Sequence, residues 1–115
     1  MAREEKLELV KGALDVLVLK TLSWGAMHGY GVSRWIRQRT AGVLTVDEAA
    51  LYQALHRLER RRWVKSEWGV SENNRRAKYY ELTAQGRRQL QSETTTWRAY
   101  AEAVFAVLDA KKASL

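Results

Sequence analysis

The segment from Asp47 to Leu82 constrains the fold more than any other part of the chain, because its hydrophobic period changes once near the middle. Apolar residues first recur at helical spacing, and after Arg62 they alternate with polar residues. The first pattern predicts an amphipathic helix, and the second predicts two short strands joined by a turn. A helix followed directly by a hairpin is typical of a winged helix-turn-helix.

Positive charge gathers in the same part of the chain. Residues 57–88 contain ten Lys and Arg against four Glu and no Asp, so this stretch carries +6 of the net charge of +7. A focused basic region attracts a polyanion, because phosphate contacts release condensed counterions. A basic run alone is usually solvated surface. Here it coincides with the predicted helix and hairpin, which favours double-stranded DNA as the partner.

Length and composition limit the rest of the molecule. The 115 residues suffice for one folded unit, and the absence of Cys excludes a disulfide framework and thiol chemistry. No run of 18 apolar residues and no signal-peptide core is present, which predicts a cytoplasmic protein without a membrane span. We expect a mainly α fold with a small β-hairpin (α+β), with a winged helix-turn-helix over residues 7–82 and a C-terminal dimerisation helix over residues 83–110 of the same compact unit.

Two further helices are predicted before this segment. Apolar residues at helical spacing indicate one helix over about residues 7–22 and another over about residues 29–40. The second helix is expected to turn four residues towards the core: Tyr30, Val32, Trp35 and Ile36. Weaker candidates for contacts with a DNA backbone are Lys11, Arg34, Arg37 and Arg39.

The third helix carries the predicted recognition surface. Asp47 is a suitable N-cap, because its carboxylate can accept hydrogen bonds from the free amides of the first turn. The buried stripe of this helix is expected to consist of Leu51, Ala54, Leu55 and Leu58. The opposite face is expected to be exposed and available to a major groove. Its residues are Tyr52, Gln53, His56, Arg57 and Arg60.

The hairpin is expected to place basic residues beside that helix. Residues 64–68 and 78–82 alternate between the two faces of the strands. The connecting turn contains Asn73 and Asn74, and asparagine tolerates the left-handed backbone conformation that turns require. The candidates for contacts with phosphates or with the minor groove are Arg75, Arg76 and Lys78.

A last helix is predicted from the N-cap Thr83 to about Leu108. Along it, apolar and small residues recur at alternating spacings of four and three, which is typical of a coiled-coil stripe. At about 1.5 Å per residue the helix would be roughly 35–40 Å long, and the stripe would stay exposed without a partner. We therefore expect a homodimer, formed with help from the first helix, through Leu90, Trp97, Ala101, Val104 and Leu108.

Four segments together resemble the PadR family of bacterial transcriptional regulators. They are KGALDVLVLKTL at 11–22, HGYGV at 28–32, ALYQALHRLERRRWV at 50–64 and NRRAKYYELTAQGRRQL at 74–90. The resemblance covers most of the chain. It implies a winged-helix dimer of the family's smaller subgroup that represses genes, often for phenolic-acid detoxification, drug efflux or stress responses. Gln53 departs from the family pattern, which commonly has Pro there, and this departure could alter the operator sequence that is read.

The individual roles on the recognition helix stay open. The resemblance marks Tyr52 as the family tyrosine, whose hydroxyl would donate to a phosphate; a half-buried aromatic residue is the alternative. Gln53 would read adenine and Arg57 would read guanine, although Arg57 could contact phosphate alone. His56 fits a DNA contact and an ordinary surface histidine equally well.

Trp97 and Tyr100 are candidates for binding a small-molecule effector. In a dimer, two copies of Trp97 near the symmetry axis could bracket a flat aromatic ligand, as some PadR-like regulators do. A tryptophan packed in the dimer core is the alternative. The function predicted from the sequence is therefore a repressor that a phenolic or planar aromatic compound releases from its operator.

Catalytic chemistry is not expected. The only histidines are His28 and His56, and the sequence contains no HExxH, phosphate-cradling or nucleophile-elbow motif. We predict a protein that is not an enzyme and needs no metal or cofactor, with His28 as a helix cap or core residue. The alternatives to a regulator are a winged-helix assembly module that binds an acidic protein and a nucleoid-type protein that binds DNA without sequence preference.

Overall fold

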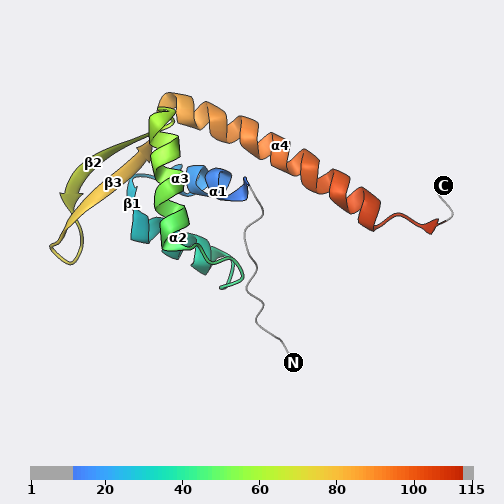
Figure 1. The fold of residues 1–115 in the computed structure, drawn as a ribbon, viewed down its shortest axis with the longest axis horizontal. Helices are drawn as coiled ribbons and strands as arrows, with labels where there is room; N and C mark the ends of the chain where they lie inside the picture. Colours follow the sequence, from blue (N-terminus) through green and yellow to red (C-terminus); the bar gives the residue numbers. More distant parts are fainter. Residues whose placement is uncertain (1–11, 113–115) are drawn as a thin grey trace.

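The computed structural model describes residues 12–112, and Figure 1 shows how their helices and strands are arranged. The elements are α1 (Ala13–Leu22), β1 (Met27–His28), α2 (Gly29–Arg39), α3 (Glu48–Arg60), β2 (Val64–Val70), β3 (Arg76–Leu82) and α4 (Ala84–Leu108). Three helices, a small antiparallel sheet and a long last helix confirm the predicted α+β winged-helix fold. The first part of the predicted helix over residues 7–22, including Lys11, lies outside the described residues.

The core lies where α1, α2 and α3 meet the inner ends of β2 and β3. Helix α1 contacts α2, α3 and α4, so it occupies the middle of the packing. The predicted stripe of α3 is buried, which confirms that helix's inward face. Removing one such leucine side chain from water stabilises the fold by about 1.5–3 kcal/mol. The largest fully buried side chains are Val18, Leu19, Thr21, Leu22, Val32, Leu51, Leu55, Leu58 and Val64.

Side-chain caps define where three of the helices begin. The carboxylate of Asp47 accepts a hydrogen bond from the backbone N–H of Ala50 at 3.1 Å, which confirms the predicted start of α3. The Nδ1 atom of His28 accepts from the N–H of Gly31 at 3.0 Å, so His28 caps α2. Because these bonds satisfy amides that have no partner within the helix, each cap stabilises its helix by about 1 kcal/mol.

The sheet has the strand order β1-β3-β2, with both pairings antiparallel. Strands β2 and β3 form the predicted hairpin and extend further than expected, to Val70 and from Arg76. Asn74 in the turn has φ 58, the left-handed conformation for which its side chain is suited. The sequence analysis missed β1, because a strand of two residues leaves no alternating pattern.

Tyr30 was expected in the core, and this expectation is wrong. Its side chain is 62% exposed, whereas Val32 and Ile36 are buried. The reason is helical geometry, since residues two apart do not share a face of a helix. Tyr30 therefore faces away from the side of α2 that Val32 occupies, and its ring is free to line a surface groove.

Helix α4 begins against the core and then leaves it. Figure 1 shows it extending away from the other elements over most of its length. Thr83 caps the helix through the N–H of Gly86 at 3.0 Å, as the sequence predicted. Among the described residues of α4, only Gly86 is buried. The exposed large apolar side chains of this helix are Tyr100, Val104, Phe105, Val107 and Leu108.

Candidate DNA-binding surface

The outward face of α3 is open to solvent along the whole helix. Gln53, His56 and Arg60 are exposed, and all three lie opposite the buried stripe. Their side chains offer an amide, an imidazole and a guanidinium, which are groups that hydrogen-bond to base edges and phosphates. An exposed helical face of this kind, flanked by a hairpin, has the shape that a major groove accepts.

Arg57 lies on a flank of α3 and not on its outward face. Its Nη2 atom donates a hydrogen bond of 2.6 Å to Oδ1 of Asp15 in α1. The arginine side chain is 38% exposed and the aspartate side chain 22% exposed, so the pair is partly shielded from water. Of the five residues expected on the open face, Arg57 is the one whose charged group already has a protein partner.

Tyr52 lies on the opposite flank, next to the N-terminus of α2. A Cβ atom on Gly29 would lie 2.7 Å from the Tyr52 hydroxyl, so a larger residue at this position would have to displace the tyrosine ring. The tyrosine is 37% exposed, and its hydroxyl lies at the edge between α2 and α3. This position is compatible both with a phosphate contact and with a half-buried structural aromatic, so its role stays a prediction.

Glu59 fastens the wing to the recognition helix. Its carboxylate accepts a hydrogen bond of 2.5 Å from the Ser66 hydroxyl in β2, and it forms an ion pair with Lys78 in β3 at 3.9 Å. Lys78 is therefore partly buried and already paired, whereas the sequence analysis treated it as a free cation. Glu59 thus connects α3 to both strands of the hairpin.

The outer part of the wing presents arginine on an aromatic support. The guanidinium of Arg76 lies 4.4 Å from the centre of the Trp68 ring. The two residues are diagonal neighbours, since Trp68 pairs with Lys78 in the strand register and Arg76 pairs with Val70. A cation–π contact of this kind is worth about 0.5–1 kcal/mol at an exposed site and limits the directions that the guanidinium can take.

The other face of the wing is stiffened by Tyr79. Its hydroxyl donates to the carbonyl oxygen of Val70 at 3.1 Å, and its ring lies across Gly69, where an added Cβ would be only 3.0 Å away. The same ring lies 5.4 Å from the imidazole of His28, measured between centres. The wing is thereby joined to the start of α2 as well as to α3.

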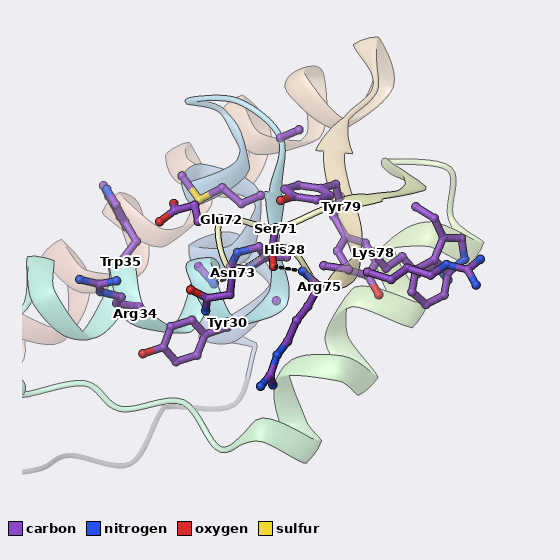
Figure 2. A pocket seen from close by; sticks show the side chains of 18 of the residues that line it. His28, Tyr30, Arg34, Trp35, Ser71, Glu72, Asn73, Arg75, Lys78 and Tyr79 are labelled. Carbon is purple, nitrogen blue, oxygen red and sulfur yellow. Dashed lines mark hydrogen bonds between the residues drawn. The ribbon is translucent and has the colours of Figure 1, made fainter.

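A groove of about 970 Å³ lies between α2 and the wing. Figure 2 shows Tyr30, Arg34 and Trp35 on one side of it and Arg75, from the turn, on the other. In the turn, the Ser71 hydroxyl accepts a hydrogen bond from the Arg75 backbone N–H at 3.4 Å. Arg34 and Arg75 have no ion-pair partner within residues 12–112. The groove therefore extends the positive surface from the wing towards α2.

Comparisons with known proteins decide the family. Residues 18–92 match the transcriptional regulator PadR-like family. The chain belongs to this family. Its members are transcriptional regulators, and this membership confirms the expectation that the protein is not an enzyme.

Solved PadR-type structures share the fold. A transcriptional regulator from Clostridium thermocellum is 30% identical and superimposes with a TM-score of 0.74, over 82% of this chain and 88% of that one. A PadR family regulator from Clostridium difficile is 28% identical, with a TM-score of 0.72 over 84% and 99% of the two chains. Bacillus subtilis PadR in complex with operator DNA is 18% identical, with a TM-score of 0.63 over 70% of this chain and 46% of that one, which shows a common fold.

The PadR-type α4 places the two predicted effector residues together. The rings of Trp97 and Tyr100 meet edge to face, with 5.7 Å between their centres. Trp97 is half-buried, and Tyr100 is 58% exposed. Leu90 packs against the core, so the start of the predicted dimer stripe is already used within the chain. The part of the predicted stripe that is available to a partner begins after Leu90.

Tyr80, at the base of the wing, has a phenol with a raised pKa. Burial raises the pKa of its phenol above 10.0, and the nearby charge of Glu59 and the phenol of Tyr52 raise it further. Burial disfavours the charged phenolate, and a carboxylate nearby repels it. Tyr80 therefore stays neutral over the physiological range and serves as a core residue of the wing.

Three contributors to this surface do not follow from the sequence pattern. The pattern predicts Trp68 only as a strand residue and Tyr30 as a core residue, and it assigns no role to Asp15. The signal for Trp68 was present, because an aromatic residue and an arginine at diagonal positions of a hairpin can stack. Asp15 has no such signal, since it is 42 positions from Arg57 in the chain.

Within residues 12–112, no group of three or more His, Cys, Asp or Glu side chains is placed to hold a metal ion. In the same part of the chain, no helix combines the length and the apolar character needed to cross a bilayer.

Proposed function

We propose that this PadR-like protein binds operator DNA in a sequence-specific manner, as a homodimer, and represses the genes it controls. Helix α3 would enter a major groove, with Gln53, His56 and Arg60 towards the base edges, and the wing would follow the adjacent backbone or minor groove. The observation that carries the proposal is the exposed α3 face beside a wing that is joined to α3 through Glu59 and carries Arg75 and Arg76 at its tip. Bacillus subtilis PadR, which was solved with operator DNA, is a precedent for this fold.

The test is a mobility-shift titration of the purified protein against the DNA upstream of its own gene, with random duplex as competitor, at several salt concentrations. A sequence-specific regulator gives a salt-sensitive shift that random competitor does not remove. Replacing both Arg75 and Arg76 by Ala should weaken binding to every duplex and reduce the slope of log affinity against log salt by about 1.8, since each phosphate contact contributes about 0.9. The matched control replaces Arg98 and Lys111, which are exposed away from the wing. An unchanged slope in the wing variant would contradict the proposed role.

The second element of the proposal is dimerisation. Residues 83–110 would form the dimer interface, and residues 7–82 would form the DNA-binding part of the same unit. The exposed Val104, Phe105 and Leu108 support it, because a contiguous set of exposed apolar side chains is typical of an interaction surface. A closed two-fold dimer would place two α3 helices about 34–36 Å apart, matching successive major grooves of a pseudo-palindromic operator. Sedimentation equilibrium of the wild-type protein and of Val104→Glu tests this: the variant should sediment as a monomer and lose operator affinity.

The third element is release by a planar aromatic or phenolic compound bound beside Trp97 and Tyr100. The exposed edge of this aromatic pair supports stacking with a flat ligand. Such a ligand needs a preference of only about 1–3 kcal/mol for a dimer that misfits the operator. Quenching of tryptophan fluorescence that disappears in Trp97→Phe would support the site. Equal quenching in the variant would mean that Trp97 only packs in the dimer core.

Two other classes of function remain as outcomes of the same titration. A protein–protein assembly module with an acidic partner would bind neither duplex with a steep salt dependence. A nucleoid-type protein would bind the upstream fragment and random DNA equally. Either outcome would be compatible with the observed fold but would exclude binding to a specific operator.

A further inference from the structure

Asp15 in α1 faces two arginines at the end of the recognition helix, Arg57 within α3 and Arg61 at its C-cap. Its Oδ1 atom accepts the 2.6 Å hydrogen bond from Arg57, and its Oδ2 atom lies 3.9 Å from Nη1 of Arg61. Arg61 has a second partner, because its guanidinium lies 5.1 Å from the centre of the Trp63 ring. Arg57 therefore depends on Asp15 more than Arg61 does.

The wing side of α3 is arranged in the same way. There Glu59 pairs with Lys78, so a carboxylate neutralises the nearest cation on that flank too. Between these flanks, Gln53, His56 and Arg60 stay exposed, and Arg60 takes part in none of the ion pairs within residues 12–112. The groups left free on α3 are thus confined to the outward face.

We propose that Asp15 is a specificity-determining residue that withholds Arg57 from the DNA backbone, an inference that rests on the proposed function. A guanidinium held by a carboxylate contributes little net attraction for phosphate, and the carboxylate itself repels a phosphate that approaches this flank. Contacts with phosphate strengthen binding to every sequence alike, whereas contacts with base edges distinguish between sequences. Offsetting the charge of Arg57 therefore lowers affinity for random DNA and leaves discrimination to the outward face.

The experiment measures the salt dependence of binding to operator and to random duplex for wild type and Asp15→Asn. The asparagine keeps the size of the side chain and removes its charge. Freeing one arginine for a phosphate should steepen the slope by about 0.9, which is about a 3.5-fold larger loss of affinity between 50 and 200 mM salt. Affinity for random duplex should rise more than affinity for the operator, so the ratio of the two falls. Glu102→Gln, at an exposed position on α4, removes the same charge elsewhere and should leave the slope unchanged.

A double-mutant cycle with Arg57→Ala separates the proposed role from a purely structural one. In the wild-type background this substitution should change the salt slope little, because Arg57 is withheld. In the Asp15→Asn background it should remove the added slope. If Asp15→Asn lowers affinity without steepening the slope, or if Arg57→Ala has the same effect in both backgrounds, the inference is wrong. Circular dichroism of each variant establishes that the proteins compared are folded.

The random-duplex measurement distinguishes failure of this inference from failure of the proposed function. Equal binding of wild type to operator and random DNA would overturn the proposed function. A steeper salt slope for Asp15→Asn on random duplex would still support the role of Asp15. If wild type prefers the operator but Asp15→Asn has an unchanged salt slope, only the inference about Asp15 is overturned. If neither protein binds either duplex, both are overturned.

Discussion

The winged-helix part of the molecule and the projecting part of α4 treat their apolar residues in opposite ways. Between Val18 and Leu82 most large aliphatic side chains form one buried core, with Leu55 and Leu58 at 0% exposure. Beyond Trp97 the aliphatic side chains of α4 are exposed, and Leu108 reaches 69%. The first region satisfies its hydrophobic surface within one chain, whereas the second needs another surface to cover it.

This difference separates two kinds of stability. Burial in the winged-helix part contributes to the free energy of unfolding of a single chain at any protein concentration. Burial of the α4 apolar face would contribute only through association, so its effect would grow with protein concentration. Substitutions in the two regions should therefore differ in their concentration dependence as well as in size.

The largest loss of folding stability is expected at the junction between the two regions, where α4 begins against the core. A Cβ atom on Gly86 would lie 2.0 Å from the carbonyl oxygen of Trp63, a backbone atom that cannot move alone. Gly86→Ala should therefore destabilise the fold by at least about 3 kcal/mol, at the upper end of overpacking effects. Thermal unfolding followed by circular dichroism measures it.

The control for this substitution is Gly31→Ala in α2. A Cβ there would be 3.4 Å from the His28 ring, an ordinary contact, and alanine favours a helix. This variant should be as stable as wild type or slightly more stable. If Gly86→Ala proved as stable as Gly31→Ala, the start of α4 would not be held tightly against Trp63, which would break the comparison.

The next effect contrasts one leucine from each region. Leu55→Ala leaves a cavity in the core and should lower the free energy of unfolding by about 2–5 kcal/mol at every protein concentration. Leu108→Ala should change it by less than about 0.5 kcal/mol in dilute protein, where its side chain is exposed, and by more as the concentration rises. Urea titrations at two protein concentrations a hundredfold apart measure both. A Leu108 effect that is independent of concentration would argue against a dimer through α4.

A smaller effect is expected from the cap that joins the wing to α4. The Thr83 hydroxyl accepts from the N–H of Gly86 at 3.0 Å and donates to the carbonyl oxygen of Arg62 at 2.7 Å. Thr83→Ala removes both bonds and should cost about 1–2 kcal/mol. Thr83→Ser keeps the hydroxyl and should recover most of the loss in chemical denaturation. A Ser variant as unstable as the Ala variant would show that the methyl group, and not the two hydrogen bonds, matters here.

Features that depend on residues close together in the chain could be predicted from the sequence, whereas contacts between distant residues could not. Local signals predicted the third and last helices, their caps at Asp47 and Thr83, and the asparagine turn, since each depends on residues close together in the chain. The prediction failed for Tyr30, where a residue two positions from Val32 was placed on the same helical face. Partners distant in the chain could not be predicted, because nothing in the local pattern connects Asp15 with Arg57 or Glu59 with Lys78.

The candidate site shows the same limit in physical terms. Sequence periodicity identifies which side of α3 is exposed, but exposure alone does not separate a free cation from one held by a carboxylate. Of the predicted basic contacts, Arg60, Arg75 and Arg76 are exposed, while Arg57 and Lys78 are paired within the chain. Their roles on DNA stay predictions. Variants of the exposed arginines should be compared first with variants of the paired residues, because the two groups should differ in their effect on DNA affinity.

The smallest expected effect concerns Tyr80, at the edge of the buried region. Its phenol has a pKa above the ordinary 10.0, because burial, the charge of Glu59 and the neighbouring Tyr52 disfavour the phenolate. The folded state therefore holds the proton more tightly than the unfolded state does. The resulting stability is fully present below pH 10 and is lost as the pH rises through the folded pKa.

Denaturation at increasing pH tests this prediction. The free energy of unfolding of wild type should fall above pH 10, and Tyr80→Phe should remove part of that fall, since phenylalanine cannot ionise. Tyr100→Phe provides the matched control, because Tyr100 is exposed in the projecting part of α4 and should leave the pH dependence unchanged. If the two variants behave alike, the phenol of Tyr80 is no better shielded from water than one on the projecting helix, and the contrast between the two regions does not extend to the base of the wing.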